Sequence, residues 1–332
     1  MKKTHASLLG ITMACAMLWS CETEPKKQES SAPTTANALR KAPDFNADTA
    51  FYYVAQQCQF GPRVPNTKAH VQAGDYLKKR FERYGLKVTV QAFEAEAFDG
   101  KKLKLRNIIA STHPTASKRL LIASHWDSRP FADQDEVNPK TPIDGANDGA
   151  SGVGIMLELA RLLSKDTGFQ VGVDLLLLDG EDYGQPENSG FPEKKDSWCL
   201  GSQYWSKNKH IPNYSAYFGI LLDMVGGKNA KFAMDGTSAY FAPEVQKKIW
   251  AIAAQSGYGA QFIPQPTEEI IDDHLYINKE GHVPMVDIIE YEPSDGAYFS
   301  PTWHTHQDNI QNIDKTTLKA VGQTVLNAIY QE

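Results

Sequence analysis

The sequence has few cysteines and no large excess of charge of either sign. Its 332 residues include four cysteines and carry a formal net charge of −6. This cysteine content is too low for a disulfide framework, and the cysteine spacing is not that of a zinc finger. The slightly acidic balance argues against the large basic surface that nucleic-acid binding requires. We therefore expect no nucleic-acid partner.

Several signatures of other catalytic classes are absent as well. No GxSxG nucleophile elbow occurs, which argues against an α/β-hydrolase mechanism. The glycine-rich stretch GANDGASG has neither a P-loop lysine nor GxGxxG spacing, so phosphate binding has no support. No internal repeat is visible, and no proline-rich linker follows residue 45. Because neither a repeat nor a linker is visible, we expect a single catalytic domain that spans residues 47–332.

The first 21 residues are typical of an export signal. Lys2 and Lys3 precede an apolar run that reaches Trp19 and is too short to span a membrane comfortably. The sequence LWSC, ending at Cys21, resembles a bacterial lipoprotein cleavage box, in which Cys21 would become the lipidated first residue. An ordinary secretory signal is the alternative.

We therefore expect a lipoprotein signal peptide over residues 1–21 and a flexible tether over residues 22–46, which are rich in Ser, Thr, Pro and Ala. The protein would be periplasmic, held to the outer membrane by its lipid alone. Cys58 and Cys199 would then remain in the domain. They could form one disulfide in an oxidising compartment, or stay as two unlinked core residues.

Apolar strands alternate with helices along the rest of the chain. Residues 48–84 are predicted to be helical, and Gly85 closes this region. VTVQAFEAEAF alternates like a half-buried strand. The other predicted strands include RLLIASH, VGVDLLLLDG, YFGILLDMVG and VPMVDIIEY, and the other helices GASGVGIMLELARLLSK, YFAPEVQKKIWAIAAQSG and KTTLKAVGQTVLNAIYQE. This alternation predicts an α/β sandwich with a mostly parallel sheet.

Polar residues gather where the predicted strands end. They are His125 and Asp127, Glu181 and Asp182, Asp223, and, in loops, Asp148, Asp272-Asp273-His274 and Trp303-His304. Ligands of open α/β sheets bind at this edge, and zinc takes imidazole and carboxylate ligands. One interpretation of this pattern is therefore a zinc site. In it, one of the adjacent residues Glu181 and Asp182 would be a zinc ligand and the other a base. Helix caps and structural loop residues are the other reading.

Six stretches in this order resemble the zinc aminopeptidase superfamily (peptidase M28-like), and within it the glutaminyl cyclases. They are HWDSRP, GANDGASGVGIMLELAR, LLDGED, LLDMVG, DDHLYINKEGHVPMVDII and WHTHQDN. The resemblance covers about residues 50–330. It implies a three-layer α/β/α sandwich around a mostly parallel, mixed central sheet.

The resemblance also implies roles for individual residues. Asp148, Asp182 and His304 match zinc ligands, although animal cyclases have Glu where this chain has Asp182. Glu181 matches the general acid/base, and Asp223 and Asp272 match its hydrogen-bonding network. Trp303 and Phe299 match pocket walls. A second pocket tryptophan has no clear counterpart, and Trp198 is the candidate for it.

The activity implied by the resemblance is cyclisation of the N-terminal glutamine of peptides to pyroglutamate, with release of ammonia. One zinc ion would polarise the γ-carboxamide, and Glu181 would carry the proton. The alternative is an aminopeptidase with two zinc ions, the second held by His125 and Asp223. A non-catalytic binding lipoprotein is a third reading, which the base Glu181 argues against. The doubled Asp272-Asp273 and Trp303 favour the cyclase. We expect peptide substrates and a monomer.

Overall fold

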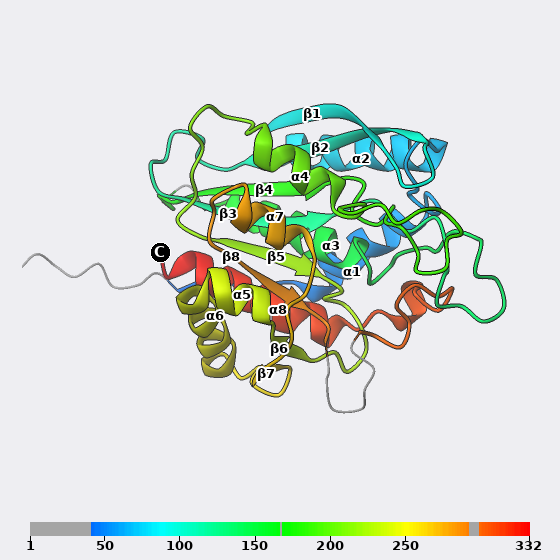
Figure 1. The fold of residues 1–332 in the computed structure, drawn as a ribbon. Coiled ribbons are helices and arrows are strands. Elements are labelled where there is room, and N and C mark those ends of the chain that lie inside the picture. The colour runs from blue at the N-terminus through cyan, green and yellow to red at the C-terminus, as the bar shows by residue number, and fades with distance from the viewer. Residues whose placement is uncertain (1–40, 167, 292–298) are drawn as a thin grey trace, which may run out of the picture. The chain divides into compact units, whose positions relative to one another are not determined.

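A six-stranded mixed sheet forms the centre of the part of the chain that the computed structural model describes, namely residues 41–166, 168–291 and 299–332 (Figure 1). The strands lie in the order β1-β2-β4-β3-β5-β8. β4, β3, β5 and β8 are parallel, and β1 and β2 are antiparallel at one edge. The strand bounds are β1 Lys87–Glu96, β2 Lys102–Ser111, β3 Arg119–His125, β4 Gly172–Leu178, β5 Gly219–Asp223 and β8 Met285–Ile289. β6 (Phe232–Met234) and β7 (Phe262–Pro266) form a separate small pair.

Helices cover both faces of the sheet, which gives the predicted three layers (Figure 1). One face packs against α1 (Ala47–Cys58), α2 (Lys68–Arg83), α3 (Ala150–Leu163), α6 (Pro243–Gln255) and α8 (Lys315–Tyr330). The other packs against α4 (Leu200–Lys207) and α7 (Asp273–Lys279). α5 (Gly236–Phe241) and the short 3₁₀ helix η1 (Ile310–Asn312) complete the set. No helix among the described residues is long and apolar enough to cross a membrane.

The central strands are mostly apolar because both of their faces are buried, and Arg119 of β3 pairs with Asp174 of β4. Every residue of β3 and β4 is buried. Leu120 and Ile122 of β3 join the core under α3, whereas Leu121 and Ala123 join the core under α4 and α7. The alternation of side chains along a strand places successive residues in different layers. The polar residues that follow these strands are therefore set at one edge of the sheet.

The predicted helix over residues 48–84 is wrong in its middle. α1 ends at Cys58 and α2 begins at Lys68. The intervening segment contains Pro62 and Pro65, which lack the N–H that a helix interior requires. Thr67 caps α2 by accepting a hydrogen bond from the His70 backbone N–H.

Other local predictions were incomplete. The helix predicted from Tyr240 onward is two helices, α5 and α6, and α6 begins at Pro243 as expected. α4, α7 and the β6–β7 pair were not predicted, because each is short and carries a weak periodic pattern. Of the two alternatives for Cys58 and Cys199, the structure has two free thiols. Cys21 and the predicted signal peptide lie outside the described residues.

Candidate active site

The predicted site residues converge on the carboxyl ends of the parallel strands. His125 is the last residue of β3, and Asp223 is the last residue of β5. Glu181 and Asp182 follow β4, and Asp148 lies in the turn before α3. Because parallel strands end at the same edge, these positions from four segments become neighbours.

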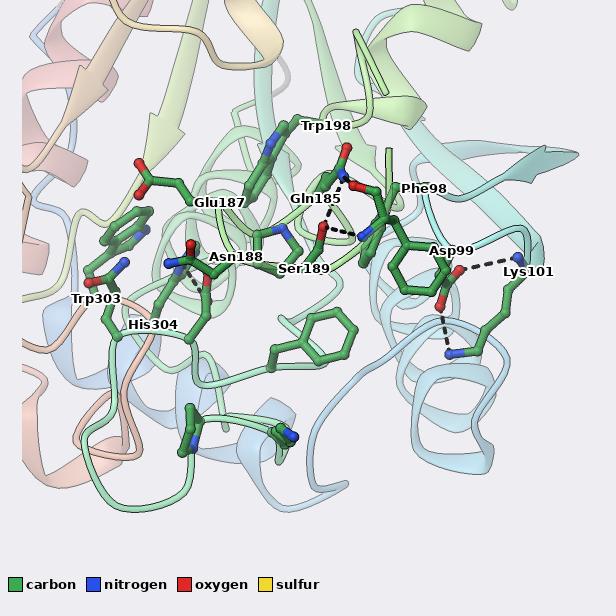
Figure 2. A pocket seen from close by; sticks show the side chains of 17 residues that line it. Phe98, Asp99, Lys101, Gln185, Glu187, Asn188, Ser189, Trp198, Trp303 and His304 are labelled. Atoms are coloured by element: carbon green, nitrogen blue, oxygen red, sulfur yellow. Dashed lines mark hydrogen bonds and ion pairs between the residues drawn. The ribbon is translucent and has the colours of Figure 1, made fainter. Parts of the chain in front are cut away.

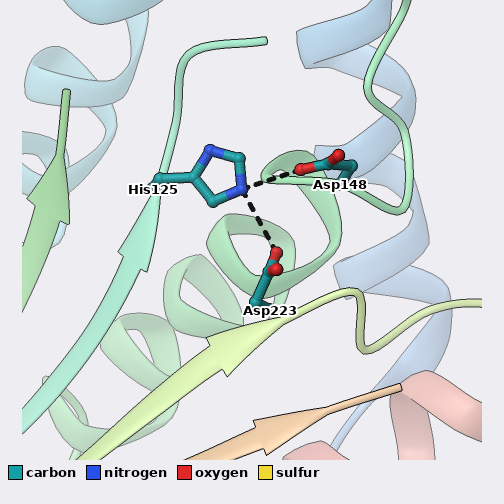
Figure 3. A group of neighbouring side chains, drawn as sticks. All are labelled: His125, Asp148 and Asp223. Atoms are coloured by element: carbon teal, nitrogen blue, oxygen red, sulfur yellow. Dashed lines mark hydrogen bonds and ion pairs between the residues drawn. The ribbon is translucent and has the colours of Figure 1, made fainter. Parts of the chain in front are cut away.

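Asp148 belongs to two groups of buried side chains. Its Oδ1 is 2.9 Å from His125 Nε2, which is also 3.2 Å from Asp223 Oδ1 (Figure 3). Its Oδ2 is 3.7 Å from His304 Nε2, which is 3.3 Å from Asp182 Oδ1. Within each group, one ligand atom from every residue lies within 4.8 Å of the others. Both the predicted zinc ligands and the predicted second-metal residues are therefore brought together.

The group of Asp148, Asp182 and His304 fits a zinc ion. Both carboxylate oxygens of Asp182 and Oδ2 of Asp148 are buried and make no hydrogen bond among the described residues, and buried carboxylate oxygens need such a partner. Two ligands of a tetrahedral zinc ion lie about 3.4 Å apart. The separations of 3.3 and 3.7 Å around His304 are close to this value. Three protein ligands leave a fourth position open for substrate.

In the group of His125, Asp148 and Asp223, His125 Nε2 hydrogen-bonds to Asp223 and lies at ion-pair distance from Asp148. The separations of 2.9 and 3.2 Å are ordinary hydrogen-bond lengths. Burial alone would lower the pKa of His125, but the neighbouring carboxylates of Asp127, Asp148 and Asp223 raise it well above its usual value. Burial raises the pKa of Asp223 to about 7, against the opposing hydrogen bond with His125. This group can share a proton between imidazole and carboxylate without a second metal.

Two further aspartates accept hydrogen bonds from backbone N–H groups of the site residues. Asp127 accepts hydrogen bonds from the backbone N–H groups of Glu181 and Asp182, both at 3.2 Å. Asp308 accepts one from the backbone N–H of Asp148 at 3.1 Å. Such contacts restrict the orientation of ligands and support a preorganised site.

Glu181 faces the same cavity as the candidate ligands. The Cys199 thiol donates to Glu181 Oε1 over 3.2 Å, and the Cys199 backbone N–H donates to the Glu181 carbonyl over 3.1 Å. Burial raises the pKa of Glu181 well above its usual range; the charge of His125 opposes this shift and that of Asp272 adds to it. Burial, together with the charge of Asp148, also raises the pKa of Asp182, to about 6. A buried carboxyl group with a raised pKa beside a cavity is able to carry a proton in catalysis.

Asp272 lies at the N-terminus of α7 and lines the same cavity. It forms a group with Glu181 and Cys199 in which one ligand atom of each lies within 4.8 Å of the others. It also belongs to a similar buried group with His274 and Asp287. The predicted neighbourhood of Glu181 and Asp272 is therefore present.

Aromatic rings enclose the cavity, which has a volume of about 200 Å³. Trp303 stacks on His304 with 3.7 Å between ring centroids, and Phe299 lies 4.9 Å from Trp303. Trp198 lines the cavity too, with its ring parallel to that of His304 at 6.0 Å. Trp198 thus occupies a wall of the pocket as a second tryptophan, although the loop that carries it has no recognisable motif.

Comparison with known proteins identifies the family. The model described as Peptidase family M28 matches residues 107–329. The chain belongs to peptidase family M28. A crystal structure of Bacteroides thetaiotaomicron glutaminyl cyclase bound to N-acetylhistamine is 52% identical and has a TM-score of 0.85, covering 88% of this chain and 100% of that one.

Two further relatives show the spread of descriptions among these M28 proteins. A Zn-dependent exopeptidase from Parabacteroides distasonis is 49% identical, with a TM-score of 0.85 and coverage of 88% of this chain and 100% of that one. The glutaminyl-peptide cyclotransferase of Gloydius blomhoffii is 26% identical over 289 residues, which cover 77% of this chain and 73% of that protein. The resemblance to M28 glutaminyl cyclases and the predicted fold are confirmed.

Two residues of this M28 site were missed by the sequence analysis. Asp133 Oδ1 lies 3.1 Å from His304 Nδ1, and the same carboxylate forms two hydrogen bonds, of 2.6 and 2.8 Å, with Arg129. Arg129 in turn lies 3.6 Å from Asp182 Oδ1. A carboxylate behind a ligating histidine fixes its tautomer and its ring orientation. The available signal was the four-residue spacing of Arg129 and Asp133 directly after HWDS, in a segment with no predicted element.

One carboxylate of LLLLDGED lies away from the site. Asp179 pairs with His70 Nε2 at 2.8 Å and accepts the Arg106 backbone N–H at 2.7 Å. Gly180 adopts a φ of 73°, which turns the chain between Asp179 and Glu181. Of the three acidic residues after β4, Asp179 therefore makes a structural hydrogen bond with His70, and Glu181 and Asp182 belong to the candidate site.

Proposed function

We propose that the chain cyclises the N-terminal glutamine of peptides to pyroglutamate and releases ammonia. The observation that carries this proposal is the small aromatic cavity that holds Glu181 beside the group of Asp148, Asp182 and His304. Its volume of about 200 Å³ suits one side chain better than an extended peptide. The similarity to glutaminyl cyclases supports the same substrate.

Asp148, Asp182 and His304 would hold zinc, which supplies a Lewis acid for the γ-carboxamide oxygen when bound. Glu181 accepts a proton from the α-ammonium group, which frees the amine to attack the carbonyl carbon of the γ-carboxamide. Glu181 then returns this proton to the departing amide nitrogen, and ammonia leaves. Trp198 and Trp303 hold the substrate side chain folded and limit access of water, so that the intramolecular attack prevails.

One zinc ion per chain is part of this proposal. The contacts of 2.9 and 3.2 Å made by His125 Nε2 give that nitrogen hydrogen-bonding partners already. The group around His304 instead has three carboxylate oxygens, from Asp148 and Asp182, that make no hydrogen bond among the described residues. The first group would serve to position Asp148, and the second would bind the ion.

An aminopeptidase with two zinc ions is the second candidate. The shared position of Asp148 between two groups is the arrangement that a bridging carboxylate needs, and one relative is described as a Zn-dependent exopeptidase. The short contacts of His125 and the similarity to several cyclases favour the first candidate.

A single assay separates the two candidates. Purified protein is incubated with a Gln-initiated dipeptide, ammonia and products are quantified, and zinc is measured in the same sample. The cyclase gives ammonia, a pyroglutamyl dipeptide and about one zinc per chain. Free glutamine without ammonia, together with about two zinc ions, would support the aminopeptidase instead.

We also propose that the protein is a monomeric lipoprotein of the cell envelope, anchored through Cys21 at the outer membrane. The support is the sequence pattern of residues 1–21 and the polar tether that follows. Peptides that reach this compartment would be its substrates.

A further inference from the structure

The cavity that contains Glu181 and the candidate zinc ligands is called the inner cavity. A second, larger cavity lies beside it. We call it the outer cavity; its volume is about 920 Å³. Trp198, Trp303 and His304 line both cavities, so the two are neighbours on either side of these rings. Figure 2 shows the three residues in the lining of the outer cavity. A peptide whose first side chain fills the inner cavity has its next residues at these rings.

Three phenylalanines from separate segments form the apolar wall of the outer cavity. Phe98 lies in the turn between β1 and β2, at 6.1 Å from Phe131 and 5.6 Å from Phe191, measured between ring centroids. Phe98 is buried, whereas Phe191 is 49% exposed. A large exposed apolar side chain beside a cavity is a feature of binding sites.

The side chains of Gln185 and Lys194 hold the loop that carries Phe191. Gln185 Nε2 donates to Ser189 Oγ at 2.9 Å and to the Phe191 carbonyl at 3.2 Å. Gln185 Oε1 accepts the Lys194 backbone N–H at 2.7 Å. Lys194 Nζ donates to the Glu96 carbonyl at 2.7 Å, which ties the loop to the end of β1. The wall is thus preformed, and little ordering is needed when a ligand binds.

Charged groups around the wall are largely neutralised by one another. Asp99 pairs with Lys101 at 2.8 Å (Figure 2), and Asp133 pairs with Arg129. Glu187 is exposed and makes no ion pair within the described part of the chain. Glu187 and the exposed Lys140 carry opposite charges on the same cavity. An apolar side chain therefore finds its suitable surface at the phenylalanine wall.

We propose that the outer cavity binds the residue that follows the N-terminal glutamine, and that it prefers a large apolar or aromatic side chain there. This inference rests on the proposed cyclase function and adds the class of peptide that is preferred. Phe98, Phe131 and Phe191 would contact the second side chain, while the glutaminyl side chain occupies the inner cavity.

The test compares two tripeptides, Gln-Phe-Ala and Gln-Gly-Ala, by ammonia release over a range of concentrations. We expect kcat/KM to be about five- to tenfold higher for Gln-Phe-Ala, because partial burial of one phenyl ring strengthens binding by about that factor. In Phe191→Ala, the ratio of the two kcat/KM values should fall towards one, mainly through a higher KM for Gln-Phe-Ala. Phe191→Leu keeps an apolar surface and should retain part of the preference.

Tyr240→Ala is the matched control, since Tyr240 is an aromatic residue with 75% exposure that does not line either cavity. It should leave the ratio as in the unaltered protein. Equal kcat/KM for the two tripeptides, or a ratio that Phe191→Ala does not change, would overturn the inference and leave the cyclase function standing. Absence of ammonia from both tripeptides would overturn the proposed function itself.

Discussion

At the scale of the residue, burial decides what the carboxylates of this site can do. Glu181 and Asp182 are adjacent in sequence, yet Asp182 contacts His304 and Glu181 contacts the Cys199 thiol. Burial raises the pKa of both, to about 6 for Asp182. The same local sequence thus provides a candidate ligand and a candidate base.

Glu181→Gln should lower kcat for glutamine cyclisation by about 10²- to 10⁴-fold, the usual contribution of a general acid/base. The amide keeps the shape of the side chain and cannot carry the proton. Zinc content should stay as in the unaltered protein, because Glu181 is outside the ligand group. Ammonia release and metal analysis of one preparation check both expectations, and normal turnover in the variant would remove Glu181 from the proton transfer.

His304→Ala should lose most of the bound zinc, because it removes one of three protein ligands. Metal analysis after dialysis measures the loss. His306→Ala is the matched control. His306 lies two residues after His304, but its Nδ1 contacts Asp135 Oδ2 at 3.0 Å and it is not part of the ligand group. Full zinc occupancy in His304→Ala would show that the ligand assignment is wrong.

At the scale of the element, short turns aim the site residues after each strand. Gly149 precedes α3 with a φ of 85°, and a Cβ there would lie 2.8 Å from His125 Cε1. The turn thus permits both the left-handed backbone and the close approach of the imidazole. Between α1 and α2, two prolines interrupt the helix although the surrounding residues have a helical pattern.

Gly149→Ala should lower the free energy of unfolding by about 2–4 kcal/mol, since strain in the backbone adds to the clash with His125. Gly257→Ala is the matched control. Gly257 has a similar φ of 89°, but its Cβ would meet nothing within 4 Å. This control should cost only about 1 kcal/mol. Urea unfolding of both variants measures the difference, and equal losses would mean that the contact with His125 is relieved at no cost.

At the scale of the whole molecule, the folded domain and the expected lipid anchor lie in different parts of the sequence. The described residues form the α/β/α domain and its site, while Cys21 lies outside them. Location in the cell would therefore depend on the first residues alone, and catalysis on the domain.

Cys21→Ser should move the protein from the membrane fraction to the soluble fraction, because lipidation requires the thiol. Fractionation of cells followed by immunoblotting measures the shift, and labelling with radioactive palmitate should be lost in the same variant. Cys58→Ser, in the domain, serves as the control and should remain with the membrane. A soluble unaltered protein would favour the ordinary secretory signal.

Much of this site could be predicted because its motifs follow strands whose apolar character is visible locally. The strand ends at His125 and Asp223 and the turn at Asp148 are marked by sharp changes from apolar to polar residues. Asp133 and Phe191 could not be assigned in this way. They lie in loops whose course depends on partners far along the chain, such as His304 for Asp133 and Phe98 for Phe191.

The alternation of strands and helices and the order of the motifs could be predicted from the amino-acid sequence, because both depend on local patterning. Which atoms contact one another depends on the packing of distant segments. Asp148 lies between two histidines, Trp198 lines the pocket, Asp179 pairs with His70, and an outer cavity lies next to the inner one. Distances between segments and the burial that raises carboxyl pKa values arise from long-range packing, which a local pattern does not contain.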